Sequence, residues 1–309
     1  MDVTHFLSIT DLTPQKVTQV IDRAQNLKNG PCPKPLEGKT IALLFEKPSL
    51  RTRVSFEVGV RQLGGECVYL SKDDVGLGVR EPVKDVARVL GRWVDGIVAR
   101  VFEHSSLVTL AEYANIPVIN ALSDLEHPCQ AIGDLLTIQE HRGQLDGQRV
   151  AFVGDGNNVA GSLAVACGST GTNFILASPM DYQLPSELWE EAKSRGAANG
   201  SSISWVELPE YAARGADVIY TDVWISMGNE SETKERMKAF GEYQVNENLM
   251  QYAKSDAIFM HDMPAKEGLE ISEGMIDHPR SVVFDQAENR LHAQKAIMVE
   301  LFDMYEGDA

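Results

Sequence analysis

The sequence FEKPSLRTRVSFEVG, residues 45–59, leads from an expected strand directly into an expected helix. Residues 40–45 form an apolar run that predicts a buried strand, and Phe56 and Val60 lie on one apolar stripe of a helical pattern. Ser49 stands between the two as a good N-cap. A buried strand that feeds an amphipathic helix is typical of a parallel sheet covered by helices.

The same alternation continues along the chain and predicts an α/β fold. Short β-branched runs alternate with helical patterns, and a break in charge near residues 144–147 divides them into two groups. We therefore expect two doubly wound parallel-sheet domains, residues 1–142 and 143–289, with a cleft between them. The helix at about 290–309 is expected to pack back on the first domain. The expected strands are 40–45, 96–100, 116–119, 149–153, 173–177, 217–221, 256–260 and 281–284.

Composition and charge exclude several classes of protein. The chain has 309 residues and a formal net charge of -17, whereas a nucleic-acid-binding protein needs a basic face. No apolar stretch reaches the roughly 18 to 20 residues that span a bilayer, and the amino terminus lacks the pattern of an export signal. We expect a cytoplasmic protein that binds neither nucleic acid nor membrane. Its cysteines are too scattered for a zinc site or a redox pair: Cys32, Cys67, Cys129 and Cys167.

The acidic charge is concentrated in the second half of the chain. Residues 1–150 carry 17 basic and 19 acidic side chains, and residues 151–309 carry 11 and 26. One interpretation is that both halves simply have solvated surfaces. The other is that the first half binds an anion and the second half accommodates a cation.

Two arginines at the start of the expected helix need an explanation. Arg51 and Arg53 fall in the first turn, where the helix dipole already presents partial positive charge. Together with the hydroxyl of Ser49 or Thr52 and the unpaired N–H groups of a helix start, they would bind a phosphate group. The alternative is that Arg53 pairs with Glu57 and Arg51 is merely exposed. Such a bridge contributes only about 0.3 to 0.5 kcal/mol, so it poorly explains both arginines.

Two further polar residues of the first half follow expected strands. Arg100 ends the run 96–100, and His127 lies in the loop after 116–119. Ligands of open parallel sheets bind beyond the carboxyl ends of the strands, so both residues would lie near the phosphate site. They would either form structural hydrogen bonds or donate to a carbonyl oxygen as it gains charge.

The second half offers acids and amides at its strand ends. Asp222 and Asp262 would bind an ammonium group, although each acid could instead cap the helix that follows it. Asn158 and Ser226 would bind a carboxylate. Arg290, after the last expected strand, would close the site over an anion or pair with a nearby glutamate.

The turn Gly154-Asp155-Gly156, after the expected strand 149–153, resembles part of a dinucleotide-binding fingerprint. However, Val159 occupies the third glycine position, and the next strand ends in Ser178-Pro179 without the acid that would hold a ribose. A nicotinamide-dependent dehydrogenase is therefore disfavoured.

Taken together, these motifs resemble the aspartate/ornithine carbamoyltransferase family over nearly the whole chain. Ser49-Leu50-Arg51-Thr52-Arg53 is similar to the family's Ser-x-Arg-Thr-Arg motif for carbamoyl phosphate. His127-Pro128-Cys129-Gln130 is similar to its His-Pro-x-Gln motif. Asp222-Val223-Trp224-Ile225-Ser226-Met227-Gly228 resembles the Asp-x-x-x-Ser-Met-Gly loop of the ornithine branch, and Gly154-Asp155-Gly156-Asn157-Asn158 resembles that branch's ornithine-binding turn.

The resemblance implies carbamoyl transfer from carbamoyl phosphate to the δ-amine of L-ornithine, which gives citrulline and phosphate. It also implies one α/β domain for each substrate, a homotrimer with shared active sites, no metal and no organic cofactor. The metabolic setting would be arginine biosynthesis or arginine breakdown. By motif, carbamoyl phosphate would contact Ser49, Leu50, Arg51, Thr52, Arg53, Arg100, His127, Gln130 and Arg290, and ornithine would contact Asn158, Asp222, Ser226 and Met227.

In the implied mechanism the neutral amine attacks the carbonyl carbon, and no protein nucleophile takes part. Thr52, Arg100 and His127 would stabilise the oxyanion, while Arg51 and Arg53 would hold the departing phosphate.

Two positions depart from the family pattern. The ornithine branch has His-Cys-Leu-Pro where this chain has His261-Asp262-Met263-Pro264. Asp262 would orient the amine or accept its proton, but a carboxylate in contact also stabilises the ammonium form and slows attack. Relatives often carry Gln or His at the position of Gly76, and its contact with a neighbouring subunit would then pass to Arg80 or Lys84.

Because of these departures, two other functions stay open. The same machinery would serve another amine, such as an acylated ornithine, putrescine or lysine. A non-catalytic paralogue that binds a metabolite is the second alternative, although the complete set of arginines and histidine disfavours it.

Overall fold

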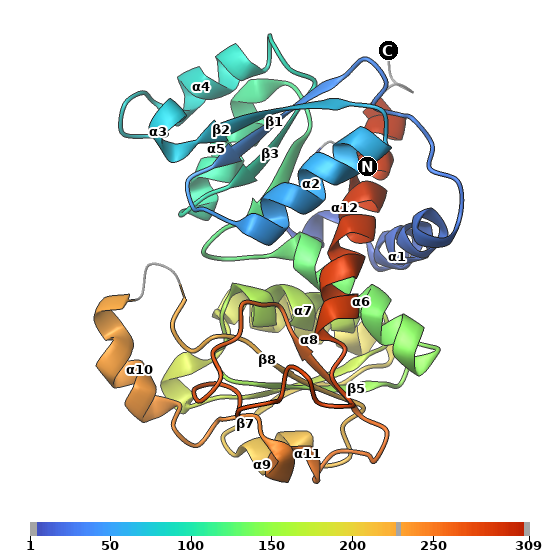
Figure 1. Cartoon of the computed structure of the whole chain (residues 1–309), viewed down its shortest axis with the longest axis vertical. Helices are drawn as coiled ribbons and strands as arrows, with labels where there is room; N and C mark the ends of the chain where they lie inside the picture. Colours follow the sequence, from blue (N-terminus) through green and yellow to red (C-terminus); the bar gives the residue numbers. More distant parts are fainter. Residues whose placement is uncertain (1–4, 227–229, 306–309) are drawn as a thin grey trace. The chain divides into compact units, whose positions relative to one another are not determined.

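The computed structural model describes residues 5–226 and 230–305 and divides into two compact units (Figure 1). Unit 1 comprises Met1–Leu136 together with Asn289–Ala309, and unit 2 comprises Thr137–Glu288. Both boundaries fall inside helices, the first in α6 (Pro128–Arg142) and the second in α12 (Val283–Tyr305). None of the helices in the described residues is long and apolar enough to cross a membrane.

Unit 1 is built on a four-stranded parallel sheet. Its strand order is β2-β1-β3-β4. The last residues of the two central strands, Phe45 and Arg100, are register partners, so the residues that follow them emerge at one edge. The strands are β1 (Thr40–Phe45), β2 (Glu66–Ser71), β3 (Gly96–Arg100) and β4 (Val118–Leu122).

Helices cover both faces of this sheet (Figure 1). On one face, α4 (Val83–Leu90) and α5 (His104–Ala114) contribute Leu90, Leu107 and Leu110 to a buried apolar cluster. On the other face lie α1, α2 and α12, and glycines allow close packing there. A Cβ added at Gly59 would lie 3.2 Å from Met298, and one at Gly96 would lie 2.8 Å from the ring of Phe302. The remaining bounds are α1 (Pro14–Asn29), α2 (Leu50–Gln62), α3 (Lys72–Val75) and the 3-10 helix η1 (Ile9–Asp11).

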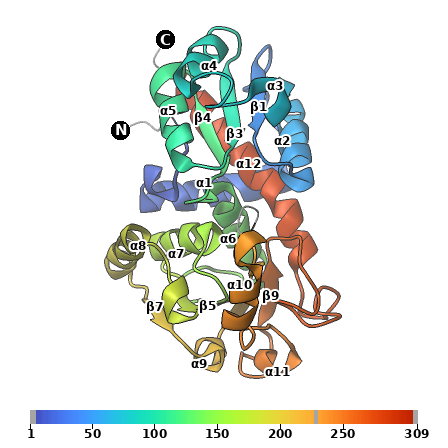
Figure 2. The ribbon, with the colours of Figure 1, turned by 90° about the vertical axis from the view of Figure 1, so that its left-hand side faces the viewer.

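Unit 2 is built on a five-stranded parallel sheet with the order β7-β6-β5-β8-β9. Helices α7 and α8 pack against each other on one face (Figure 2). The other face is covered by a buried cluster that includes Ala212 of α9, Phe240 after α10 and Leu249 of α11. The strands are β5 (Arg149–Val153), β6 (Asn173–Ala177), β7 (Ile203–Val206), β8 (Val218–Thr221) and β9 (Ile258–His261). The helices are α7 (Asn158–Ser169), α8 (Ser186–Asn199), α9 (Pro209–Ala213), α10 (Thr233–Ala239), α11 (Glu247–Met250), η2 (Met180–Tyr182) and η3 (Glu230–Glu232).

The expected fold of two parallel-sheet α/β units is confirmed. Seven expected strands are present, with ends shifted by no more than three residues. The strand expected at 281–284 is wrong, because Ser281 forms only an isolated bridge to Phe259 and α12 begins at Val283. Strands β2 and β7 were missed, since both lie at sheet edges, where partial exposure removes the continuous apolar run of a central strand.

In each sheet there is one pair of adjacent strands from which the chain continues in opposite directions along the sheet. In the first sheet β1 is followed by β2 on one side, whereas β3 lies on its other side. In the second sheet the same reversal separates β5 from β8. The carboxyl ends of strands at such a position are where open α/β sheets bind ligands. The polar residues after β1, β3, β5 and β8 are therefore the candidate ligand-binding residues.

Candidate functional site

The helix start after β1 is capped by Ser49. Its hydroxyl accepts a hydrogen bond from the Thr52 N–H at 3.3 Å. Arg51 is half-buried and Leu50 is exposed. The side chain of Arg53 contacts Glu57 and Tyr69. Its Nε lies 2.8 Å from Glu57 Oε1, and its guanidinium carbon lies 3.6 Å from the centre of the Tyr69 ring. The pairing of Arg53 with Glu57, expected as the alternative to phosphate binding, is thus present. Contact of Arg53 with phosphate stays a prediction.

The hydroxyl of Thr52 is the centre of a buried polar cluster in unit 1. It accepts a hydrogen bond from Arg290 Nη2 at 2.7 Å, and Arg100 Nη1 lies 3.5 Å away. His127 Nε2 lies 3.4 Å from the same Arg290 nitrogen. All four side chains are buried. We call Thr52, Arg100, His127 and Arg290 the Thr52 cluster.

Four separate elements supply this cluster. Thr52 lies in the first turn of α2 and Arg100 ends β3, while His127 precedes α6 and Arg290 lies in α12. Guanidinium groups stay protonated at all physiological pH values, so two like charges approach one hydroxyl in a buried setting. An anion placed beside them would offset their repulsion. The cluster, at the N-terminus of α2, is therefore suited to a phosphate-bearing ligand with a polarisable carbonyl oxygen.

Gln130 lies one turn into α6 and is fully buried. Its Nε2 donates to Asp134 Oδ1 at 2.7 Å, which fixes the amide plane. Within the described residues its Oε1 accepts no hydrogen bond. An acceptor oxygen held in this way could receive a hydrogen bond from the NH2 group of a carbamoyl ligand.

The second cluster lies at the strand ends of unit 2. Asp222 follows β8 and is buried. Its Oδ2 accepts from Asn157 Nδ2 at 2.7 Å, and its Oδ1 accepts from the Val223 N–H at 2.6 Å. Asn157 was not among the expected site residues. Its position as the N-cap of α7, where it accepts from the N–H groups of Val159 and Ala160, is the signal that could have identified it.

Asp222 is joined by His261, the last residue of β9, and by Asp262 and Glu270, which follow that strand. His261 Nδ1 lies 3.5 Å from Asp262 Oδ1, and His261 Nε2 lies 3.4 Å from Glu270 Oε1. His261 is itself held by backbone contacts, because its N–H donates to Gln286 and its Nδ1 accepts from the Met263 N–H at 2.9 Å. We call Asn157, Asp222, His261, Asp262 and Glu270 the acid cluster.

Burial and mutual repulsion change how the acid cluster binds protons. Burial raises the pKa of Asp222 well above its ordinary value, and the negative charge of Asp262 raises it further. Burial lowers the pKa of His261, but Asp262 and Glu270 outweigh it and raise the value to about 9. Asp222 and His261 thus hold their protons more strongly than the same side chains do in water.

The acid cluster also contains groups that metals bind. Asp222, His261 and Asp262 each offer one ligand atom, and these atoms lie within 4.8 Å of one another. Asn157 and Met263 already donate hydrogen bonds to two of these groups. The same carboxylates suit a protonated amine equally well, since both ligands are cations.

Other expected residues of unit 2 lie around these acids. Asn158 is half-buried, and its Oδ1 accepts from the Val159 N–H at 3.1 Å. Ser226 is half-buried, and Met227 lies outside the described residues. The two strand-end loops are tied together by Arg236, which donates to Asp155 at 2.6 Å and to the carbonyl of Trp224 at 3.1 Å.

These features define a class of protein. It is an α/β protein whose first unit carries a buried cationic cluster suited to a phosphate-bearing group and whose second unit carries an acidic cluster suited to an amine. A donor of an activated group and an amine acceptor are the substrates of a group-transfer enzyme.

The comparisons identify the family. Residues 4–140 match the aspartate/ornithine carbamoyltransferase carbamoyl-P binding domain, and residues 146–301 match the Asp/Orn binding domain of the same family. The chain belongs to the aspartate/ornithine carbamoyltransferase family. It is 49% identical over 296 residues to the ornithine carbamoyltransferase of Thermococcus kodakarensis, with 94% of each chain covered. It is 50% identical over 303 residues to that of Acidothermus cellulolyticus, with 97% of each covered.

A solved structure gives the same result. The ornithine carbamoyltransferase from Pyrococcus furiosus superimposes on this chain with a TM-score of 0.94 at 45% sequence identity. The superposition covers 98% of both chains. The resemblance inferred from the motifs is thus confirmed at the level of the family and of the fold.

Proposed function

We propose that this chain transfers the carbamoyl group of carbamoyl phosphate to the δ-amine of L-ornithine, which gives L-citrulline and phosphate. The observation that carries the proposal is the Thr52 cluster, in which two guanidinium groups meet at one hydroxyl and an imidazole lies beside one of them. Membership of the family supports carbamoyl transfer as the reaction. The relatives described above are ornithine carbamoyltransferases, which supports ornithine as the acceptor.

Carbamoyl phosphate would bind in unit 1. The phosphate group would lie at the N-terminus of α2, where Arg51 and the first N–H groups stabilise its charge. The carbonyl oxygen would face the Thr52 cluster, whose donors stabilise the oxyanion that forms on attack. Gln130 would accept from the carbamoyl NH2 group. Arg53 would join this set only by leaving Glu57.

Ornithine would bind in unit 2. Its ammonium groups match the negative charge of Asp222 and Asp262, and Asn158, Ser226 and Met227 would surround its remaining polar atoms. The δ-amine must lose a proton before its lone pair can attack the carbonyl carbon. A carboxylate whose pKa is raised accepts such a proton more readily than an ordinary one, and Asp222 meets that condition. We assign the same role to Asp262, its neighbour in the acid cluster.

No protein nucleophile is required in this scheme. As the amine nitrogen bonds to the carbonyl carbon, the carbon–oxygen bond to phosphate breaks, and the phosphate departs with that electron pair. Positioning of the two substrates and preorganised charge around the carbonyl oxygen would supply most of the rate acceleration.

The decisive experiment is a citrulline assay with a panel of amines. The protein is incubated with carbamoyl phosphate and ornithine, an acylated ornithine, putrescine or lysine, and phosphate release is followed in parallel. We expect kcat/KM for ornithine to exceed that for every other amine by at least about 100-fold. A faster reaction with another amine would reassign the acceptor. Absence of phosphate release with all amines would favour a non-catalytic protein. An Asp262→Cys variant, measured beside the wild type, shows whether the carboxylate changes the rate or the choice of amine.

We further propose a homotrimer with shared active sites. The segment after β2 offers exposed Arg80 and Lys84, and Gly76 adopts a left-handed backbone with φ of 60°. A Cβ at Gly76 would lie 2.8 Å from the Cβ of Arg80, so a larger residue does not fit this turn. The neighbour contact that relatives make from this position would therefore pass to the two basic side chains.

Subunit complementation tests the shared site. An Arg51→Ala chain and an Arg80→Ala/Lys84→Ala chain are each expected to be nearly inactive. When the two variants are mixed, dissociated and reassembled, activity should return. The reason is that some interfaces then combine an intact Arg51 from one chain with intact Arg80 and Lys84 from its neighbour. Mixtures that stay inactive despite forming hybrid trimers, as judged by analytical ultracentrifugation, would contradict the arrangement.

We also propose that the protein works in the cytoplasm and in arginine biosynthesis. All four cysteines are free thiols, which supports a reducing compartment. Expression of the chain in a cell that lacks this carbamoyl transfer should restore growth without arginine. Failure of an active protein to restore growth would favour a role in arginine breakdown.

A further inference from the structure

The first described residues run beside β4 as a short additional strand. Phe6 forms a parallel bridge with Ile119. The Phe6 N–H donates to the carbonyl of Val118, and the Asn120 N–H donates to the carbonyl of Phe6, both at 2.8 Å. We call residues 5–12 the N-terminal clamp. It extends past the carboxyl end of β4, toward the loop that carries His127.

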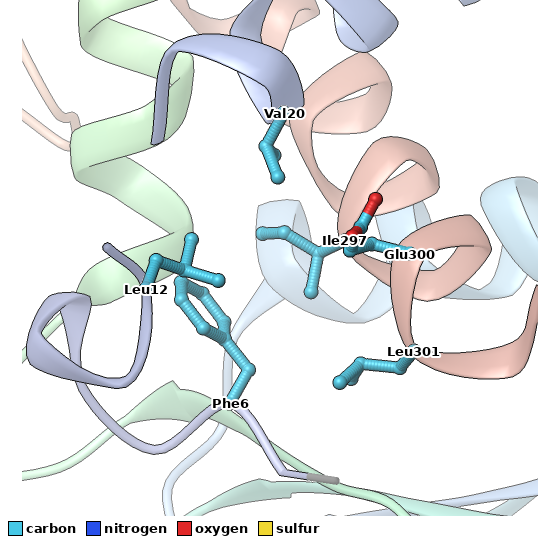
Figure 3. A pocket seen from close by; sticks show the side chains of 6 residues that line it. All are labelled: Phe6, Leu12, Val20, Ile297, Glu300 and Leu301. Carbon is cyan, nitrogen blue, oxygen red and sulfur yellow. The ribbon is translucent and has the colours of Figure 1, made fainter. Parts of the chain in front are cut away.

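One side of the clamp is fixed by apolar packing. Figure 3 shows Phe6 and Leu12 directed toward Ile297 of α12, around a small pocket that Val20 of α1 and Leu301 of α12 also line. All five side chains are at most 2% exposed. This packing sets where the polar groups of the clamp point.

The other side of the clamp donates hydrogen bonds to Glu126. The Ser8 hydroxyl donates to one carboxylate oxygen, and the Ile9 N–H donates to the other at 3.2 Å. Asp11 fixes these donors by accepting from the N–H groups of Leu7 and Ser8. Glu126 is 2% exposed, so its charge is buried and needs such donors.

Glu126 immediately precedes His127 in a loop with little freedom. The Ser123 N–H donates to the Glu126 carbonyl at 2.9 Å, and the Glu126 N–H donates to the Ser123 hydroxyl at 3.2 Å. The Asn120 side chain ties this loop to the clamp by donating to the Leu7 carbonyl at 2.8 Å. On its other side His127 is continuous with α6, because its carbonyl accepts from the Gln130 N–H at 3.0 Å.

We propose that Glu126, held by Ser8 and Ile9, is a positioning residue that orients His127 toward the carbonyl oxygen of the carbamoyl donor. The inference rests on the proposed role of His127 in stabilising the oxyanion. Glu126 itself touches no substrate. It acts through the peptide bond that joins it to His127. The N-terminal clamp holds the Glu126 carboxylate in place and thereby fixes the position of that peptide bond. Displacement of a catalytic group by about 1 Å is enough to lower a rate by up to about 10²-fold.

The Glu126→Gln variant tests the proposal. Its NH2 group cannot accept a hydrogen bond, so one of the two donors of the clamp loses its acceptor. We expect kcat to fall about 10- to 50-fold, since misorientation weakens an interaction made in the transition state. The KM for ornithine should stay within about twofold, because the expected ornithine residues belong to unit 2. An unchanged kcat would overturn the proposal.

Ser8 provides a milder matched pair of variants. Ser8→Ala removes one donor to Glu126, and Ser8→Thr retains a hydroxyl. We expect a loss of about three- to tenfold in kcat for the alanine variant and recovery of most of that loss by threonine. Equal rates for the two variants would contradict a role of this hydroxyl. The pair keeps the test valid if Glu126→Gln fails to fold.

A double-mutant cycle separates positioning from stability. If Glu126 acts through His127, then Glu126→Gln causes no further loss of kcat in a His127→Ala background. If the loss of kcat in the double variant equals the product of the two single losses, the effect of Glu126 is purely structural and the inference is wrong. A His127→Ala enzyme with a near-normal rate would instead refute the proposed role of His127. Wild-type protein without citrulline formation would refute the proposed function as a whole.

Discussion

The Thr52 cluster and the acid cluster differ in whether their charges can change. Arg100 and Arg290 carry positive charge at every pH at which the protein is folded. Asp222 and His261 bind and release protons, and the negative charge of Asp262 raises the pKa of both. The Thr52 cluster is therefore electrostatically fixed, whereas the acid cluster should set the pH dependence of both activity and stability.

Removal of a fixed charge should have the largest effect. We expect Arg51→Ala to lower turnover by at least about 10³-fold, because the departing phosphate loses a guanidinium partner. The fold should remain intact, as Arg51 is only half-buried. Citrulline formation under saturating substrates measures the loss. Arg61→Ala, which changes an exposed arginine of the same helix, is the matched control. A near-normal rate for the Arg51 variant would remove this residue from the site.

The tie between the strand-end loops of unit 2 should give the next largest effect. Arg236→Met leaves the buried Asp155 carboxylate without its ion pair, so the free energy of unfolding should fall by about 3 kcal/mol. Urea denaturation followed by fluorescence measures the change. Glu232→Gln is the control, because it removes the more exposed partner of the same guanidinium. Equal destabilisation by both variants would argue against a special contribution of the buried pair.

The acid cluster should make stability fall as pH rises. Asp222 has a raised pKa, so the folded state holds this proton above the ordinary value of 3.8, and stability is lost as pH rises from there. His261, raised to about 9, contributes stability that is complete below 6.5 and lost as pH rises through 9. Asp262→Asn reduces both shifts. The two changes have opposite effects on stability, because relief of the repulsion on Asp222 stabilises the protein and loss of the carboxylate beside protonated His261 destabilises it. Since His261 loses its proton as pH rises through about 9, the Tm of the variant relative to wild type should be about 3 °C higher at pH 10 than at pH 6. Thermal scans that show the same Tm difference at both pH values would contradict the coupling.

The smallest effect is expected for Arg53, which pairs with Glu57 in the structure. Arg53→Ala should break its exposed bridge to Glu57 and its contact with Tyr69, which contribute little because solvent screens them. Turnover should change by less than about threefold if Arg53 keeps this place. A loss comparable to that of Arg51→Ala would restore its role at the phosphate. Steady-state kinetics on the two variants side by side decides between them.

The sequence predicted the fold class and most strands because central parallel strands are continuous apolar runs. It failed where local pattern is weak. Strands β2 and β7 lie at sheet edges, and Ser281 pairs with β9 through a single bridge. The motif residues Thr52, Arg100, His127 and Arg290 were all expected, and the structure brings them together. Asn157 and the clamp around Glu126 were missed, since no local pattern relates Ser8 to a carboxylate 118 positions later.

The sequence by itself determined which chemical groups follow each strand, because strand, turn and helix start are coded within a few adjacent residues. It also determined that Arg51 and Arg53 share one helical turn. Only the tertiary structure decided that Arg53 lies over the ring of Tyr69, that Arg290 reaches a hydroxyl 238 positions earlier, and that Asp222 meets Asn157. The physical reason is that parallel-sheet register and helix packing bring distant residues together, and local propensity does not encode those contacts.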